Sequence, residues 1–221
     1  MNCYNCGIEL SYETNHVEHI PAKNLFNTYP EEYKQNLLTV PACYTCNVEL
    51  FSKIDQEIRD VIGVLNNSEE LKKELTAKAA KSIMRKSNWK DRLFLCENGK
   101  SIQVSFSYND IKSLHIKNFK GLFYGKYGKP LSEKYKIVVI AEGDEEDEKA
   151  QEINKSMRRF LNLKTEWDFI GHPKVFRYKM IACDNDKMLY DIKNIDDAVG
   201  FVCIMNYHNA IHPLVMAFIN K

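Results

Sequence analysis

The spacing of apolar and polar residues predicts the elements of this chain, beginning with two short strands near the start. Alternation predicts strands at 8–12 and 16–20, and Pro21 ends the second because proline removes a ladder donor. A polar loop then leads through 36–41 in this prediction. Apolar residues at near-helical spacing predict a helix over 48–64. The first part of the chain therefore reads as strand, strand, helix.

The rest of the chain mixes helical and strand patterns. Asn98-Gly99 between two apolar runs predicts a tight hairpin, and the run at 135–141, apolar except for Lys136, is typical of a sheet centre. The chain is predicted to be α+β, with a small unit at 1–66 and a larger α+β domain with a mostly antiparallel sheet at 67–221. In that domain we predict helices at 68–87, 109–127 and 148–161, and strands at 92–96, 102–106, 135–141, 175–183, 188–192, 198–205 and 214–219.

Composition narrows the class of protein. The chain has 221 residues, of which 44% are hydrophobic and 28% charged, ordinary values for a soluble globular protein. No apolar run approaches a membrane span and the start of the chain lacks a signal-peptide pattern, so we expect a cytoplasmic protein with no membrane partner. The net charge of +1 gives no overall nucleic-acid signature, so attraction for a polyanion requires local patches.

Two CxxC pairs carry the strongest chemical signal in the sequence: Cys3 with Cys6, and Cys43 with Cys46. Seven cysteines are an odd number, and in a reducing compartment this pattern favours a metal over disulfides. Four thiolates form a closed tetrahedral zinc site, which is structural because no position stays open. A zinc ribbon is the common alternative, but here the gap is longer and contains a further candidate site. A unit this small needs the metal to fold.

That further site consists of one base and two hard oxygen ligands. His19 suits the general base for phosphodiester hydrolysis near neutral pH, and Glu18 with Asn47 offers oxygens that suit Mg²⁺ or Mn²⁺. Adjacent strand residues face opposite ways, so Glu18 and His19 converge on one phosphate only if the strand bends. His16 shares a face with Glu18 and is either an extra ligand or a histidine packed beside the zinc knuckle.

These residues resemble a known family. The succession Cys-x-x-Cys-Gly, Glu-His-Ile-Pro-Ala-Lys and Asn-Leu-Leu-Thr-Val-Pro-Ala-Cys-x-x-Cys-Asn, over about 3–53, resembles the zinc-stapled HNH endonucleases with a treble-clef ββα-metal unit. The resemblance implies that His19 is the general base, and that Glu18, at a position more often Asp, binds the ion together with Asn47. Asn36 matches the middle Asn, which orders the loop beneath the histidine. The implied activity is DNA cleavage with one divalent ion and a 5′-phosphate product.

Three interpretations remain open. The leading one is a DNA endonuclease, suited to bacterial defence, whose C-terminal domain selects the substrate, a protein partner or a homo-oligomer. The others are a zinc-dependent nucleic-acid-binding module without cleavage and a structural adaptor. Lys23 and Lys53 are candidate phosphate contacts or ordinary solvated lysines, and the basic helix at 68–87 is a candidate backbone contact or a solvated face. The remaining histidines and cysteines have no ligand spacing and read as structural: His115, His172, His208, His212, Cys96, Cys183 and Cys203.

Overall fold

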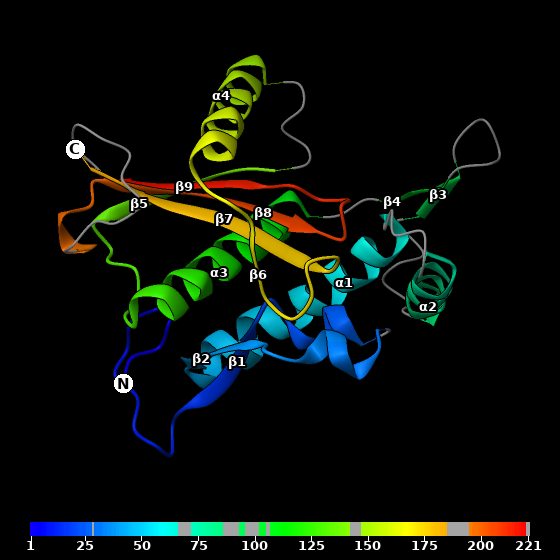
Figure 1. The fold of residues 1–221 in the computed structure, drawn as a ribbon. Helices are drawn as coiled ribbons and strands as arrows, with labels where there is room; N and C mark the ends of the chain where they lie inside the picture. Colours follow the sequence, from blue (N-terminus) through cyan, green and yellow to red (C-terminus); the bar gives the residue numbers. More distant parts are fainter. Residues whose placement is uncertain are drawn as a thin grey trace.

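The structure, a computed structural model, is mixed α+β as the sequence predicted (Figure 1). It describes residues 1–27, 29–65, 72–85, 93–95, 102–104, 107–141, 147–184 and 195–219. The elements in chain order are β1 (His16–Ile20), η1 (Lys23–Phe26), η2 (Glu31–Lys34), β2 (Leu38–Ala42), the π-helical η3 (Thr45–Phe51), α1 (Ser52–Leu65), α2 (Lys72–Arg85), β3 (Leu93–Leu95), β4 (Ile102–Val104), α3 (Tyr108–Tyr127), β5 (Tyr135–Ile140), α4 (Glu148–Lys164), β6 (Asp168–Phe169), β7 (Phe176–Cys183), η5 (Ile195–Asp197), β8 (Gly200–Tyr207) and β9 (Leu214–Ile219).

A five-stranded sheet of order β5-β9-β8-β7-β6 forms the centre of the molecule, and every neighbouring pair in it is antiparallel. The central strand β8 is buried along its whole length, with Phe201 and Cys203 in one core cluster and Val202 and Ile204 in the other. The prediction that 135–141 lies at the sheet centre is wrong, because β5 pairs only with β9 and forms an edge. Its apolar character reflects covered faces rather than two neighbouring strands.

The two faces of the sheet have different covers. Helix α4 lies on one side, and α3 with the β1–β2 hairpin lies on the other (Figure 1). On the α3 side, a single cluster of buried apolar residues runs from the N-terminal unit into the sheet, for example from Phe26 and Ile62 through Phe119 to Phe176. The core therefore continues across the proposed boundary between 66 and 67, and that boundary stays a prediction.

The N-terminal hairpin pairs β1 with β2 in antiparallel register, with Glu18 opposite Val40. The bounds of β1 agree with the predicted strand at 16–20. The loop predicted through 36–41 is wrong, because Leu38–Ala42 is a strand despite its proline. Pro41 is tolerated because its carbonyl accepts from the Tyr4 amide, so the proline faces away from β1 and no ladder bond is lost. The strand predicted at 8–12 is also wrong, since only an isolated bridge between Asn2 and Glu9 forms there.

Helix α3 packs unusually close to this hairpin. A Cβ atom on Gly121 would lie 2.3 Å from Ile20 Cγ1, and one on Gly125 would lie 2.7 Å from Leu38 Cδ2. The two glycines are four residues apart and share one helix face. They allow α3 to approach β1 and β2 where any side chain would collide. The helix ends at Gly128, whose φ of 71° is left-handed.

Other predicted helices and strands are found with shifted ends. The helix expected over 48–64 begins earlier, as η3, and runs into α1. The predicted hairpin at 92–106 is present as β3 paired with β4. Several predicted features lie outside the described residues: the turn Asn98-Gly99, the strand at 188–192, most of the acidic run at 142–148 and both ends of the helix at 68–87.

Candidate functional site

The four cysteines of the CxxC pairs come together in one cluster. The Sγ atoms of Cys3, Cys6, Cys43 and Cys46 all lie within 4.8 Å of one another, and those of Cys6 and Cys43 are 3.8 Å apart. A tetrahedral zinc ion with Zn–S bonds of about 2.3 Å separates its sulfur ligands by about 3.8 Å. The cluster therefore fits a metal such as zinc, as the spacing predicted.

Main-chain turns and N–H···S contacts shape this cluster. Gly7 has a φ of 75° and its amide donates to the Cys3 carbonyl at 2.9 Å, which closes the first knuckle. Asn5 Nδ2 donates to Cys46 Sγ at 3.2 Å, while the Asn5 carbonyl accepts from Lys120 Nζ of α3 at 2.8 Å. The cluster is thus attached directly to α3.

Among the described strands, β1 pairs with β2 alone, so one of its edges has no neighbouring strand there. Because Pro41 has no N–H and its carbonyl bonds to Tyr4, the Val17–Pro41 pair cannot exchange hydrogen bonds. Hydrogen-bonded and non-hydrogen-bonded pairs alternate along an antiparallel ladder, so the main-chain groups of Val17 and His19 point away from β2. They are available to side chains that approach this edge.

Glu18 and Asn47 both reach that edge. Asn47 Nδ2 donates to the Val17 carbonyl at 3.2 Å, and the His19 amide donates to Glu18 Oε1 at 2.9 Å. The accepting carbonyl belongs to Val17 and the donating amide to His19, the residues before and after Glu18. The carboxylate from β1 and the amide from η3 therefore both contact main-chain groups of this edge. Glu18 achieves this by folding its carboxylate back onto the main chain, not by a bend in the strand.

The imidazole of His19 is half-buried and lies on the opposite face of β1 from the buried part of Glu18. Burial lowers its pKa below the usual histidine value, and the positive charges of Lys23 and Lys117 lower it further. The neutral ring, which is the form that can accept a proton, is therefore favoured at neutral pH.

The Glu18 carboxylate contacts a buried ammonium group. Lys117 of α3 is fully buried; its Nζ lies 3.4 Å from Glu18 Oε1 and also bonds to Asp55 Oδ2 of α1. Burial raises the pKa of Glu18; the Lys117 charge opposes this and the Asp55 charge reinforces it, so the net shift is upward. Burial also raises the pKa of Asp55 against the effect of Lys117. We call Glu18, Asp55 and Lys117 the acidic cluster.

The acidic cluster contains polar atoms without partners. Among the described residues, Glu18 Oε2, Asp55 Oδ1 and the nearby Tyr4 hydroxyl are buried and make no hydrogen bond. Two carboxylates face a single ammonium. Carboxylate oxygens are the donor type that a hard divalent cation prefers.

Sequence reasoning did not identify Asp55, Lys117 or Tyr4. A signal for Lys117 was present, because it lies among apolar residues on the buried side of α3 beside Leu114. A lysine in such a position needs a buried acid, and that requirement points to a partner. The sequence could not say which acid, since the lysine and Asp55 are 62 residues apart.

Two other predicted residues lie near His19. Lys23, in η1, is exposed and close enough to contribute to the lowered pKa of His19. Asn36 is exposed, with a left-handed φ of 57°, and precedes β2, in which Thr39 pairs with His19. Their roles as a phosphate contact and a loop-ordering residue stay predictions.

His16 and Lys53 lie at the margins of the site. The ring of His16 packs edge-on against Tyr44 of the second knuckle, with centroids 5.6 Å apart, which agrees with the alternative of a histidine packed beside the knuckle. Lys53 is exposed on α1. Their roles as a ligand and a phosphate contact are untested.

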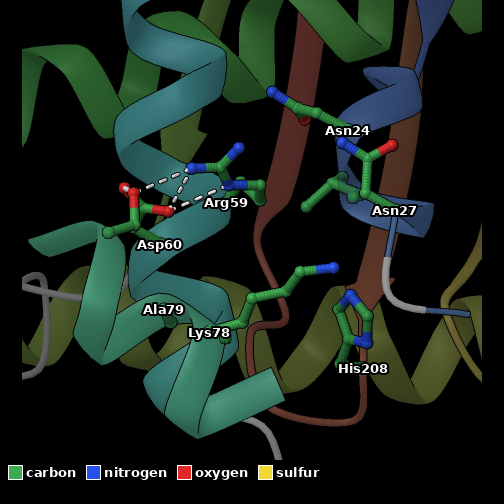
Figure 2. Close-up of a pocket in the computed structure, with 10 residues that line it drawn as sticks. Asn24, Asn27, Arg59, Asp60, Lys78, Ala79 and His208 are labelled. Carbon is green, nitrogen blue, oxygen red and sulfur yellow. Dashed lines mark hydrogen bonds and ion pairs between the residues drawn. The ribbon is translucent and has the colours of Figure 1, made fainter. Parts of the chain in front are cut away.

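A second group of charges lines a cavity of about 150 Å³ between η1, α1 and α2 (Figure 2). Asp60 Oδ1 accepts from Arg59 Nε at 2.9 Å and from Arg59 Nη2 at 2.5 Å, and Asp60 Oδ2 accepts from Ser82 Oγ at 2.8 Å. Lys78 extends into the cavity and His208 borders it (Figure 2). We call Arg59, Asp60 and Ser82 the α1–α2 cluster; it joins the two helices.

Two of the histidines predicted to be structural connect the N-terminal unit with loops of the sheet. The Tyr29 hydroxyl and His208 Nδ1 are 2.7 Å apart, and the rings of Tyr33 and His172 stack with centroids 3.6 Å apart. Burial lowers the pKa of His208 to about 4. These contacts help to fix the sheet against the unit that carries the cysteines.

The remaining cysteines agree with the prediction of unreactive thiols where they are described. Cys203 is fully buried in β8, and burial raises the pKa of its thiol. Cys183 is half-buried, and burial raises its pKa as well. Cys96 lies outside the described residues.

Comparison of the chain with protein-family models, with curated proteins and with solved structures finds no match. The site must therefore be interpreted from its own geometry. Within the described residues, the helices are all too short or too polar to span a bilayer.

Proposed function

We propose that this protein is a metal-dependent HNH endonuclease that hydrolyses phosphodiester bonds in DNA, with its first 66 residues forming a zinc-stapled, treble-clef ββα unit. The observation that carries the proposal is that Glu18 and Asn47 both contact the edge of β1 that faces away from β2, in the strand that also carries His19 and close to the four-cysteine cluster. A nucleic-acid-binding knuckle or an adaptor needs neither a base nor hard oxygen ligands at that position.

Each residue has a role in this proposal. His19 accepts the proton of the attacking water, helped by the environment that keeps its ring neutral. Glu18 and Asn47 hold a magnesium or manganese ion, which when bound stabilises negative charge on the phosphate and the leaving oxygen. Lys23 contacts the nucleic-acid backbone near the base, and Lys53 does so from α1. The domain at 67–221 selects the substrate, a protein partner or the oligomeric state.

The structural-adaptor reading remains the second candidate, because a specific observation favours it. The N-terminal unit and the sheet share one apolar core, and Lys120 of α3 bonds to the zinc knuckle through the Asn5 carbonyl. A unit that only held the sheet in place would need these contacts and no others. It would not need the paired carboxylate and amide.

The proposal is tested with purified full-length protein, supercoiled plasmid and single-stranded DNA, each with Mg²⁺, Mn²⁺ or a chelator. His19→Ala should lower the cleavage rate by roughly 10²–10⁴-fold, the usual contribution of a general base, while zinc content and circular dichroism stay unchanged. His212→Ala, a histidine variant in the loop before β9, is the matched control and should cleave normally. Equal cleavage by wild type and His19→Ala would end the nuclease proposal.

DNA affinity measured over a salt series separates the remaining readings. A nucleic-acid-binding protein loses affinity steeply as salt rises, because bound phosphates release counterions. If His19→Ala binds DNA with this dependence and wild type never cleaves, the binding module is correct. No binding even at low salt would leave the adaptor.

A further inference from the structure

The buried ammonium of Lys117 already occupies one side of the carboxylate that the divalent ion would use. We propose that Lys117, held in place by Asp55, competes electrostatically with the ion at Glu18, so that the ion binds weakly until a nucleic-acid phosphate is present. The inference rests on the proposed role of Glu18 as an ion ligand. Asp55 and Lys117 are positioning residues in this proposal, since they act through Glu18.

The contacts fix where the ammonium lies. Lys117 is fully buried, and its Nζ touches Glu18 Oε1 and Asp55 Oδ2, which come from β1 and α1. Two carboxylates from different elements therefore contact the same ammonium. Glu18 Oε1 is therefore committed to Lys117 and to the His19 amide, and Oε2 is the oxygen left for an ion.

The geometry then sets a charge balance. An ion on Oε2 lies a few Å from the ammonium on Oε1, because both oxygens belong to one carboxylate. Repulsion between a divalent ion and a unit positive charge at such a distance in a buried site is large enough to change affinity by more than tenfold. Against this, the acidic cluster has one negative charge in excess, which alone cannot neutralise a divalent ion. A phosphate of the substrate supplies the missing negative charge.

A purely structural role for Lys117 makes a different prediction. As an ion pair that joins α3 to the hairpin, it would affect the stability of the fold and leave the affinity of a properly folded protein for metal unchanged. Measuring the metal itself, not only cleavage, distinguishes the two roles.

The experiment measures the affinity of zinc-loaded, DNA-free, full-length protein for Mn²⁺ by electron paramagnetic resonance. Lys117→Met, which removes the charge and keeps the length, should bind Mn²⁺ at least tenfold more tightly than wild type. Lys179→Met is the matched control. Lys179 is also a buried lysine, but it lies in β7 of the C-terminal sheet and bonds to the Thr165 carbonyl, so its loss should not change the affinity for Mn²⁺. Addition of a non-cleavable oligonucleotide should tighten Mn²⁺ binding in wild type more than in Lys117→Met.

Unchanged or weaker Mn²⁺ binding by folded Lys117→Met overturns the inference. If that variant does not fold, Asp55→Asn replaces it: it keeps the ammonium and removes one carboxylate, so Mn²⁺ binding should weaken at least tenfold. Unchanged or tighter Mn²⁺ binding by Asp55→Asn would also overturn the inference. Plasmid cleavage reports separately on the proposed function. If wild type cleaves DNA but the variants do not change Mn²⁺ affinity as expected, only the competition by Lys117 is rejected. If the Mn²⁺ affinities change as expected but wild type does not cleave, only the nuclease proposal is rejected.

Discussion

Two buried aspartates on α1 lie little more than one helical turn apart, and their surroundings differ. Both oxygens of Asp60 accept hydrogen bonds from Arg59 or Ser82, so the α1–α2 cluster is complete within the protein. Asp55 bonds to Lys117 through one oxygen, and its other oxygen has no hydrogen-bond partner. Buried polar groups are almost always paired, so the hydrogen bonding within the acidic cluster is less complete than within the α1–α2 cluster.

The two clusters also differ in charge. In the α1–α2 cluster one carboxylate faces one guanidinium, whereas in the acidic cluster the carboxylates of Glu18 and Asp55 share one ammonium. The first arrangement connects helices α1 and α2. The second carries negative charge in excess at the edge of β1, where the proposed site lies. Both clusters therefore bury charge, and the completeness of hydrogen bonding is what distinguishes them.

The largest effect should come from removing a zinc ligand. Cys43→Ala should lose most of the metal-binding free energy, which for structural zinc is roughly 10–16 kcal/mol, and the hairpin with the acidic cluster should lose its order. The α1–α2 cluster should survive because it does not depend on the cysteines. Hydrogen exchange read by mass spectrometry tests this: amides of β1 and β2 should exchange faster than in wild type, and those near Arg59 and Ser82 should not. Equal loss of protection in both places would mean that the two clusters are not independent.

Removing one aspartate from each cluster tests the comparison most directly. Asp60→Asn breaks a complete pair and should lower the free energy of unfolding by about 3 kcal/mol, because Arg59, whose side chain is only 27% exposed, loses its counter-charge. Asp55→Asn leaves Glu18 and Lys117 as a one-to-one pair, so it should lower that free energy by only about 1 kcal/mol. Urea unfolding of zinc-saturated protein measures both. A larger loss for Asp55→Asn would contradict the assignment of the acidic cluster as the one with surplus charge.

The approach of α3 to the hairpin can be tested at Gly121, one turn after Lys117. Gly121→Ala puts a methyl group against the Ile20 side chain and should lower the free energy of unfolding by roughly 1–3 kcal/mol through overpacking. The added methyl also pushes Lys117 away from Glu18. Ser113→Ala, on the same helix, serves as the reference for an ordinary alanine substitution. If both variants unfold at the same urea concentration, the close approach does not contribute to stability.

An effect confined to acidic pH concerns His208, which borders the cavity of the α1–α2 cluster. Its pKa, lowered by burial to about 4, lies below the value of about 6.5 expected in the unfolded chain, so the unfolded state binds the proton more readily. The stabilisation is therefore complete above about pH 6.5 and is lost as the pH falls towards 4, by roughly 2–3 kcal/mol. His208→Asn, which tolerates the left-handed φ of 51°, should flatten the stability profile in that window. An unchanged pH slope would show that another group causes it.

The elements that the sequence predicted well are those with local signals. The bounds of β1 follow from a few alternating residues, those of β9 from a short apolar run, and α3 from apolar spacing that ends at Gly128. β2 was not predicted because it contains Pro41. Whether a proline removes a hydrogen bond of the sheet depends on which side of the strand its nitrogen faces, and the sequence does not show this. The edge position of β5 was also beyond the sequence, since strand order depends on contacts between distant segments.

The site divides in the same way. Spacing alone brought the four cysteines into one predicted cluster, and the motif singled out Glu18 and Asn47, which the structure places at one strand edge. The acidic cluster could not be predicted, because the contact of Lys117 with Asp55 exists only once α3 has docked on the hairpin. That docking depends on Gly121 and Gly125, whose meaning in the sequence is ambiguous: a glycine inside a helix is as easily a weak point as a contact surface.

The position of α3 has a practical consequence for work on shorter versions of this protein. A fragment that ends near residue 66 would keep the carboxylates of Glu18 and Asp55 but lose the ammonium of Lys117, which contacts both of them. It would also expose Ile20 and Leu38, which α3 now covers. We expect such a fragment to aggregate through this exposed apolar surface.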